Sequence, residues 1–396
     1  MNGDDATSAT PATSAADVLG FDPFDPEFRR DPYVRYREMS DQGALFRTPG
    51  GLFVATTYEL CAALLRDPRF GRGGGPVNGR AAGEPVQSFL WMDPPDHTRL
   101  RGLVSRAFTP RMLERLRPRV EALTAELVDA LPEEADLVSG LAYPLPVMVI
   151  SEMLGVPAED YTRFRDWSES LARGLDPILT DDLAAESGRA GMEFRAYFSE
   201  LIAIRRADPG DDLLSALTQV SELTEGELLA TCVLLLVAGH ETTVNLIANG
   251  VLNLTRHGLL KHAAVRPKQV VEEVLRYDPP VQLTSRQALV DVELGGVAVP
   301  KGAKVMALIG AANRDPAVFS DPDRFDVTRE PGRHLAFGLG IHFCLGATLA
   351  RMEGEIALSA LAAAAPGLAL VDEHPPYKGN LVLRGLAELR VRRGRG

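Results

Sequence analysis

Cysteine is scarce in this chain of 396 residues, which contains only Cys61, Cys232 and Cys344. The number is odd, the three positions lie far apart, and no C-x-x-C pair occurs. The sequence therefore excludes a disulfide framework and gives no support to a zinc knuckle. We expect a protein of the reducing cytoplasm.

Positive charge and long hydrophobic runs are also in short supply. Lys and Arg total 42 against 54 Asp and Glu, and the net charge of −12 argues against wholesale binding to nucleic acid or to an anionic membrane. The most apolar stretch, "LLATCVLLLVAG" at 228–239, is shorter than the ~20 residues that span a bilayer. We therefore expect neither a nucleic-acid nor a membrane partner, and we predict a buried core helix at 228–239.

The first twenty residues, "MNGDDATSATPATSAADVLG", are small, polar and acidic. They lack the basic start and the apolar core of a secretory signal, so we predict a disordered arm at 1–20. The remainder, 21–396, shows no repeat and no long linker. It is predicted to form one domain.

Helical periodicity dominates that domain. Apolar residues recur at three- and four-residue spacing over 31–42, 57–67, 109–131, 140–155 and much of 183–206. The longest helix is predicted from Thr224, where Glu227 completes a capping box, to about Gly258. Strand signals are short and comprise a hairpin around Pro49 and small sheets within 292–308 and 381–393. The expected fold class is mainly α with small β-sheets.

The segment "HLAFGLGIHFCLGATLAR", at 334–351, combines a cysteine with several glycines just before a predicted helix. Glycines at 338, 340 and 346 let the backbone turn sharply and let amide N–H groups approach an acceptor. Cys344 lies at the mouth of the helix, whose dipole favours a thiolate. Such a thiolate can be the single axial ligand of a haem iron. The alternative is an inert cysteine buried as a small hydrophobe, which is the interpretation we adopt for Cys61 and Cys232.

The stretch "FGLGIHFCLG" at 337–346 resembles the haem-binding loop of the cytochrome P450 family, F-G-x-G-x-H-x-C-x-G, at every defined position. The resemblance is to the soluble bacterial, ferredoxin-dependent type. It implies that Cys344 is the proximal ligand of haem b, that Phe337 packs beside the sulfur and that His342 points to a haem propionate. Gly338 and Gly346 complete the loop. The haem is then expected between the long central helix and the helix that follows Cys344.

The stretch "AGHETT" at 238–243 lies in the middle of the longest predicted helix. The Thr242 hydroxyl can compete for the carbonyl of Ala238 and loosen the helix there, and Gly239 leaves room for a ligand. In the family this place holds dioxygen, and the resemblance implies that Thr242 and Glu241 relay protons to it. Without the family, a threonine capped inside the helix and a solvated glutamate explain the residues equally well.

Two further matches concern the support of the haem. In "EEVLR", Glu273 and Arg276 are three residues apart, and with "DPDRF" they resemble the family's structural clamp, in which Arg324 would be the third member. The clamp is expected to hold the cysteine loop in place.

A cationic cradle for the propionates is the second match. His97 and Arg101 in "DPPDHTRLR" share one helix face, and Arg286 follows in "QLTSRQA". Together with His342 they would compensate the two negative charges of the haem propionates. An ordinary solvated basic helix is the alternative explanation.

Together these matches imply a monooxygenase that inserts one oxygen atom from O2 into a C–H or C=C bond. The expected substrate is a medium-sized, largely apolar secondary metabolite such as a polyketide, macrolide or peptide. The electrons would come from a ferredoxin and its reductase, docked on a local excess of arginine between 97 and 119: residues 99, 101, 106, 111, 115, 117 and 119. Two other classes stay open. One is a haem-thiolate isomerase, dehydratase or peroxygenase, and the other is a non-catalytic haem sensor.

Overall fold

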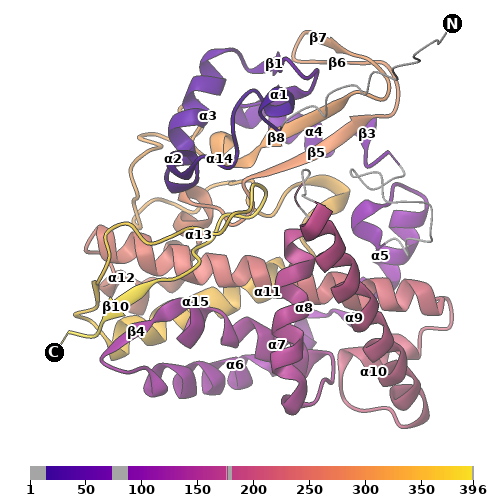
Figure 1. The fold of residues 1–396 in the computed structure, drawn as a ribbon, viewed down its shortest axis with the longest axis vertical. Coiled ribbons are helices and arrows are strands. Elements are labelled where there is room, and N and C mark those ends of the chain that lie inside the picture. The colour runs from indigo at the N-terminus through magenta and orange to yellow at the C-terminus, as the bar shows by residue number, and fades with distance from the viewer. Residues whose placement is uncertain (1–14, 74–87, 175, 177–180, 395–396) are drawn as a thin grey trace, which may run out of the picture.

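The computed structural model describes residues 15–73, 88–174, 176 and 181–394. Helices form most of it (Figure 1). They are α1 (Ala15–Leu19), α2 (Pro26–Arg30), α3 (Pro32–Asp41), α4 (Tyr58–Arg66), α5 (Asp96–Ala107), α6 (Pro110–Ala130), α7 (Pro144–Met153), α8 (Tyr161–Arg173), α9 (Asp181–Ala207), α10 (Leu213–Thr218), α11 (Glu225–Arg256), α12 (Lys261–Val265), α13 (Pro267–Tyr277), α14 (Ile309–Ala312) and α15 (Ala347–Ala364).

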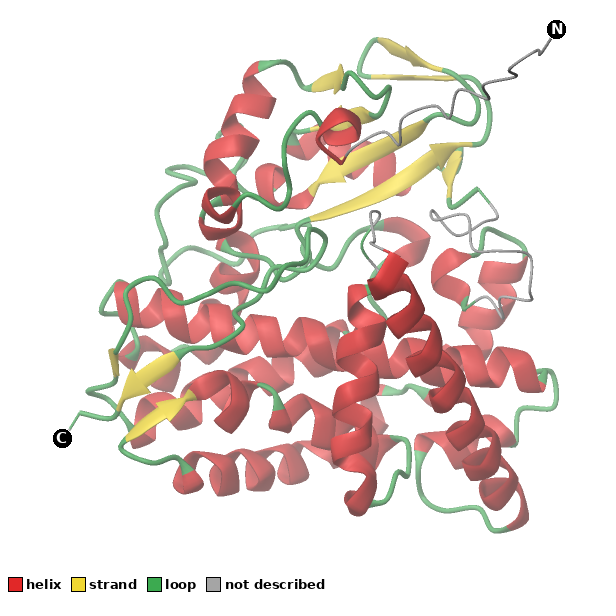
Figure 2. Ribbon diagram, in the orientation of Figure 1, coloured by secondary structure: helices red, strands yellow, loops and turns green. Residues whose placement is uncertain are grey.

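The strands are short and gather mainly in one layer, above the large helices in the view of Figure 2. They are β1 (Leu45–Arg47), β2 (Phe53–Ala55), β3 (Phe70–Gly71), β4 (Glu134–Asp136), β5 (Leu283–Ala288), β6 (Val292–Leu294), β7 (Val297–Val299), β8 (Lys304–Leu308), β9 (Ala369–Leu370) and β10 (Arg390–Arg392). The main sheet has the order β1-β2-β8-β5-β3, and β2 and β8 pair in parallel. The predicted class, mainly α with small β-sheets, is confirmed.

Helix α11 forms the axis of the helical layer. It begins as predicted, because the Thr224 side chain accepts from the Glu227 N–H while the Glu227 side chain accepts from the Thr224 N–H. It ends before Gly258, whose φ of +64° favours glycine. The helix packs on α7, α8, α13 and α15, which bury it on nearly all sides.

The apolar part of α11 is longer than the stretch that the sequence predicts. An 18-residue window with a mean hydropathy of 1.4 is long and apolar enough to cross a membrane, but 72% of that window is buried inside the structure. A helix covered in this way by its neighbours has the pattern of a core helix.

The structure corrects the N-terminal boundary. The predicted disordered arm ends at residue 20, yet Ala15–Leu19 form α1, whereas residues 1–14 lie outside the described part of the chain. Leu19 is 3% exposed and packs in a cluster that includes Tyr36 and Leu283. The apolar surface of Leu19 therefore draws this segment onto the domain.

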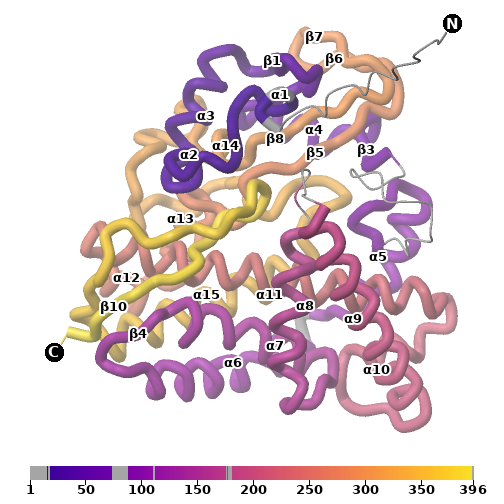
Figure 3. The backbone as a smooth tube through the Cα atoms, viewed as in Figure 1, coloured from indigo at the N-terminus to yellow at the C-terminus, as the bar shows by residue number. Residues whose placement is uncertain are grey.

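The C-terminal segment returns to the middle of the molecule. Its hairpin-like tip pairs with the chain before β5 through a bridge between Val281 and Leu383 (Figure 3). The N–H of Lys378 donates to the carbonyl of Gly385 at 2.9 Å, which closes the base of the tip. The tip therefore lies beside α11 and the sheet at once.

Candidate functional site

The cysteine loop is a tight turn ahead of α15. The Cys344 N–H donates to the Phe337 carbonyl at 2.9 Å, which closes the loop. Gly338 and Gly340 have φ values of +68° and +70°, in the left-handed region that favours glycine. At Gly340 a Cβ would lie 2.3 Å from the carbonyl oxygen of Leu65, so a larger residue would also collide with α4. The predicted need for glycine is confirmed at these two positions.

Cys344 differs from the other two cysteines in its surroundings. Cys61 and Cys232 are buried, as predicted, whereas Cys344 is exposed and stands just before the N-cap Gly346 of α15. Although its surface is accessible, the protein packed around Cys344 raises the pKa of its thiol, and this outweighs the lowering by the Gly346 N–H and by Arg101 and Arg351. The helix N-terminus and the two arginines therefore do not lower the pKa of this thiol below its usual value, and a bound cation would favour the thiolate further.

Basic side chains from three separate segments converge near this loop. The rings of His97, on α5, and His342, in the cysteine loop, lie 4.4 Å apart between centroids. Arg286 on β5 is 5% exposed, and the Arg101 side chain reaches the carbonyl of Phe343. The predicted cradle is thus brought together around the loop.

Many nitrogens of this cradle have no partner within the described residues. Both ring nitrogens of His97, which is 2% exposed, make no hydrogen bond, and neither does Nε2 of His342. Buried polar groups in folded proteins are almost always paired. The geometry is that of a site for a ligand with several acceptor oxygens.

The pKa values of the cradle residues also indicate a site for an anionic ligand. Burial and then the neighbouring cations Arg72 and Arg286 lower the pKa of His342 to about 2. Burial lowers the pKa of Arg286 to about 10, and burial together with Arg286 lowers the pKa of Arg72 to about 9. Only Asp93 opposes these shifts in the two arginines. A ligand with two negative charges would relieve this crowding of cations.

Arg72 is a member of the cradle that sequence reasoning missed. It follows β3, whose residue Gly71 pairs with Gln287, so the strand register places Arg72 beside Arg286. Its backbone N–H donates to Asp93 at 2.8 Å, and its guanidinium lies 5.3 Å from the Trp91 ring. In the sequence Arg72 is only one arginine within a glycine-rich stretch, and no local signal links it to residue 286.

The middle of α11 has an accessible patch within a buried helix. Ala238 is exposed, although residues 235–237 before it are buried. The Thr242 hydroxyl donates to the Ala238 carbonyl at 3.0 Å, which is the competition predicted from the sequence. The helix nevertheless continues without a break, so the expected loosening does not interrupt it.

Gly239 makes a different contact from the expected one. A Cβ at this position would lie 3.3 Å from Cδ1 of Ile150 on α7. The glycine therefore allows α11 and α7 to pack closely, and Ala238 rather than Gly239 presents the accessible surface. The sequence alone does not reveal which of two adjacent small residues faces another helix.

Glu241 is neither solvated nor free of partners. It is 2% exposed, and its Oε1 lies 2.6 Å from Nζ of Lys378 in the C-terminal segment. Its Oε2 has no hydrogen-bond partner among the residues that the structure describes, and it lies 3.7 Å from Nε2 of His240. The solvated glutamate that the sequence left open is excluded by this burial.

An apolar cluster lies next to this part of α11. It joins α8, α11, the chain before β5 and the C-terminal tip. Its buried members are Ala172, Val237 and Leu383, with Leu171, Val233, Val281 and Val382 packed against them.

The clamp is built, but with a different third member. Glu273 and Arg276 form a bidentate ion pair with both distances at 2.7 Å, and each side chain is 2% exposed. Arg324 is exposed and contributes only its carbonyl, which accepts from Arg276 at 3.0 Å. Arg329 takes the place predicted for Arg324, with Nε 3.4 Å from Glu273. The turn after Asp321 directs residue 324 outward and brings residue 329 back toward α13.

Two hydrogen bonds connect the clamp to the cysteine loop through Asn313. Arg276 donates to the carbonyl of Asn313, and the Asn313 side chain accepts from the N–H of Leu335 at 2.7 Å. Leu335 lies two residues before Phe337, where the loop begins. The clamp therefore fixes the start of the loop.

Glu272 forms a second support that the sequence did not indicate. Burial alone would raise its pKa, but its hydrogen bonds to His334 and Arg351 lower it to about 2. The Arg351 guanidinium lies 4.4 Å from the centre of the Phe337 ring. Glu272 thus holds the cation that covers the ring at the start of the loop.

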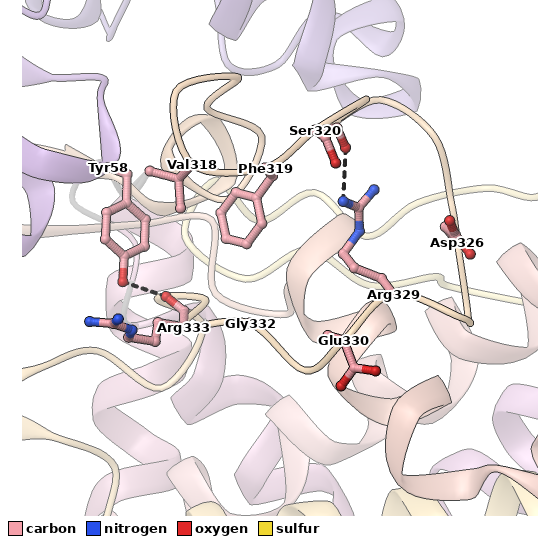
Figure 4. A pocket seen from close by; sticks show the side chains of 9 residues that line it. All are labelled: Tyr58, Val318, Phe319, Ser320, Asp326, Arg329, Glu330, Gly332 and Arg333. Carbon is pink, nitrogen blue, oxygen red and sulfur yellow. Dashed lines mark hydrogen bonds between the residues drawn. The ribbon is translucent and has the colours of Figure 1, made fainter.

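A pocket of 660 Å³ is lined in part by the clamp residue Arg329 (Figure 4). Tyr58, Phe319, Arg329 and Arg333 are among the residues that line it, and Arg329 donates to the carbonyl of Ser320 at 2.8 Å. None of the predicted site residues lines this pocket. It belongs to the segment that completes the clamp.

Comparisons with known proteins identify the family of this chain. The sequence model of the family described as Cytochrome P450 matches residues 268–362, which include α13 and the cysteine loop. Cytochrome P450 monooxygenase PikC of Streptomyces venezuelae is 42% identical over 413 residues, covering 97% of this chain and 96% of that protein. 6-deoxyerythronolide B hydroxylase of Saccharopolyspora erythraea is 44% identical over 313 residues, covering 76% of this chain and 76% of that protein.

A solved structure gives the same result. Ligand-free CYP164A2 of Mycobacterium smegmatis has a TM-score of 0.87 and 47% identity, and the match covers 93% of this chain and 98% of that chain. An accessible cysteine at a helix mouth and a cradle of unpaired basic nitrogens fit the iron and the two carboxylates of haem. This chain therefore belongs to the cytochrome P450 family and is a haem-dependent monooxygenase.

Proposed function

We propose that this P450 oxidises a medium-sized, largely apolar secondary metabolite, by hydroxylation or epoxidation, in the cytoplasm. The observation that carries the proposal is the exposed Ala238 with the half-buried Thr242 one turn later, between buried residues in the middle of α11 and beside an apolar cluster. Such a place offers a hydroxyl for proton transfer and aliphatic walls for a substrate. A relative named for the hydroxylation of 6-deoxyerythronolide B supports a secondary metabolite such as a macrolide or another polyketide.

We further propose how the residues of this chain hold the haem. Cys344 would supply the proximal thiolate, with Phe337, Gly338 and Gly346 shaping its loop. His97, Arg101, Arg286 and His342, joined by Arg72, would bind the two propionates. When bound, the haem supplies the oxidising chemistry that thiolate ligation favours.

The reaction needs two protons and two electrons for each turnover. One oxygen atom of O2 enters the substrate and the other leaves as water. Thr242 is suited to pass a proton, because a hydroxyl is both donor and acceptor and its present bond to the Ala238 carbonyl can be exchanged. Glu241, the adjacent buried acid, would relay that proton: its carboxylate takes up a proton from the solvent side and passes it on to Thr242.

Replacing Thr242 by alanine tests this role. We expect product formed per electron pair to fall about tenfold, with the electrons appearing as hydrogen peroxide, because the hydroxyl that delivers protons is lost. The measurement is product and peroxide per NAD(P)H consumed, with ferredoxin and its reductase supplied. Thr242→Ser should restore coupling. Thr243→Ala is the matched control, since Thr243 is buried and its hydroxyl donates to the Gly239 carbonyl. Full coupling in Thr242→Ala would contradict the proposal.

The same assay separates the other two classes. A haem-thiolate isomerase, dehydratase or peroxygenase would turn over without ferredoxin, and a sensor would bind carbon monoxide without forming product. The accessible threonine beside a buried acid favours the monooxygenase over both, because neither alternative needs proton delivery to dioxygen.

We also propose that α5 and the start of α6 dock an acidic ferredoxin. The arginine excess is smaller than the sequence indicates, because four members form ion pairs within the chain: Arg99 with Glu227, Arg115 with Asp211, Arg117 with Glu121 and Arg119 with Glu152. Arg101 turns inward to the cysteine loop. Arg106 is exposed, and within the described part of the chain it forms no ion pair; the side chain of Arg111 lies outside the described residues.

Reversing the charge at these two positions tests the docking surface. The variant Arg106→Glu/Arg111→Glu should be reduced by ferredoxin about tenfold more slowly at low salt, and the difference should shrink as salt screens the charges. Stopped-flow reduction at several ionic strengths measures it. Arg163→Glu, an exposed arginine on α8, serves as the control. Unchanged kinetics in the double variant would exclude this surface.

A further inference from the structure

A lysine of the C-terminal segment reaches the acid of the central helix. Lys378 Nζ and Glu241 Oε1 lie 2.6 Å apart, and the side chains are 18% and 3% exposed. A carboxylate this deeply buried retains its charge only when a cation or several hydrogen bonds compensate it. Its second oxygen, Oε2, has no hydrogen-bond partner among the described residues. The ion pair with Lys378 is therefore the main support of the charged form.

The other titratable groups that face Glu241 carry no positive charge at neutral pH. His240 is fully buried, and burial lowers its pKa even though Glu241 opposes the shift. Tyr143, whose ring lies 5.4 Å from that of His240, has its pKa raised by burial and then by Glu241. On α8, Ser168 binds His240 at 2.8 Å, and Glu169 adds a negative charge. Among the described residues, Lys378 alone supplies the countercharge.

The backbone of Lys378 is fixed at the base of the C-terminal tip, which contributes to the apolar cluster beside α11. Its N–H donates to the Gly385 carbonyl at 2.9 Å, at the base of the C-terminal tip. Within that tip Leu383 bridges to Val281 and packs against Val237 of α11. A displacement of the tip would therefore move the lysine relative to the acid.

We propose that Lys378 is a positioning residue for proton delivery: it keeps the Glu241 carboxylate charged and in place, and it couples that carboxylate to the segment that contacts the substrate. This inference rests on the proposed function of Glu241 as the acid next to Thr242. It adds a residue outside the central helix to the proton-delivery machinery.

The variant Lys378→Met removes the countercharge and leaves most of the side-chain volume. The buried carboxyl should then take up a proton at neutral pH, because an unpaired charge is costly in that environment. Lys378→Arg keeps the charge and should behave like the wild type. Lys301→Met, an exposed lysine in the turn before β8, is the matched control.

The first measurement does not depend on turnover. Infrared spectroscopy of the haem-loaded protein at pH 7 in H2O and D2O should show the C=O band of a protonated carboxyl in Lys378→Met. This band should be additional to that of the buried Glu353, whose pKa is raised by burial. It should be absent from difference spectra of Lys378→Arg and Lys301→Met taken against the wild type. It should also disappear in Lys378→Met/Glu241→Gln, which assigns it to Glu241. If Lys378→Met does not fold, Lys378→Gln replaces it in the same comparison. Absence of the band from the folded variant would overturn the proposal.

The second measurement is the pH profile of coupling, taken as product per NAD(P)H. In Lys378→Met the profile should move to higher pH by about one to three units, while Lys378→Arg and Lys301→Met keep the wild-type profile. A profile that does not move would overturn the positioning role. A failure of the proposed function has a different signature. It would show as full coupling in Thr242→Ala, or as a wild type that forms no oxygenated product, and neither result depends on the infrared spectrum.

Discussion

Replacing Cys344 by serine is expected to abolish both turnover and the absorption band of a sulfur-ligated haem in the reduced, carbonylated protein. The reason is chemical, because a serine hydroxyl does not replace a thiolate as a strong axial donor to iron. The structure sharpens the expectation, because Cys344 is the one exposed cysteine and lies at the N-terminus of α15. The measurement is the carbon monoxide difference spectrum of purified protein, together with the haem content.

Cys61 and Cys232 provide matched controls for this substitution. Both are buried within helices, Cys61 in α4 and Cys232 in α11. Serine at either position should lower the free energy of unfolding by about 1–3 kcal/mol, because a hydroxyl is placed in an apolar site. The spectrum should not change. A sulfur-ligated band that survives in Cys344→Ser, or that is lost in Cys61→Ser or Cys232→Ser while the protein stays folded, would contradict the assignment of the ligand.

Replacing Arg276 by methionine should lower the free energy of unfolding by about 3–5 kcal/mol, because it leaves the carboxylate of Glu273 buried without its bidentate partner. The same change removes the hydrogen bonds to the carbonyls of Asn313, Pro322 and Arg324. Since Asn313 holds the start of the cysteine loop, haem should also be released faster. Urea unfolding and transfer of haem to an acceptor protein measure the two effects.

Arg324→Met is the control for the clamp. The Arg324 side chain is exposed and its carbonyl survives the substitution, so the expected change in stability is within about 0.5 kcal/mol. Arg329→Met should lie between the two, because its contact with Glu273 is longer at 3.4 Å. Equal losses in Arg276→Met and Arg324→Met would show that the clamp includes Arg324 after all.

The comparison of Arg324 with Arg329 shows what the sequence could predict and what it could not. A capping box, a glycine turn and the pair Glu273–Arg276 are set by residues within about four positions of one another, and the structure contains all of them as predicted. Which of two arginines returns to α13 depends on the course of an irregular segment. No periodic pattern encodes that course.

The candidate site follows the same division. The sequence located Cys344, Thr242 and four of the five cradle residues through local motifs. It missed Arg72, Glu272 and Lys378, because each is brought to its partner by a contact between distant segments. The antiparallel register of β3 on β5, and the tip that folds back across α11, can be read only once the chain is folded. Leu19 was missed for the same reason, since an apolar residue in a polar arm gains its partners from other elements.

The parallel pairing of β2 with β8 bears on how the chain is made in the cell. Phe53 pairs with Val305, about 250 residues later in the sequence. At a translation rate of about 5–20 residues per second, the ribosome needs roughly 13–50 seconds to deliver the partner strand. During that time the N-terminal hairpin has an open edge and an uncovered apolar face. Chaperones that shield nascent chains would therefore have their first substrate here, and a shortage of them should reduce the yield of soluble protein.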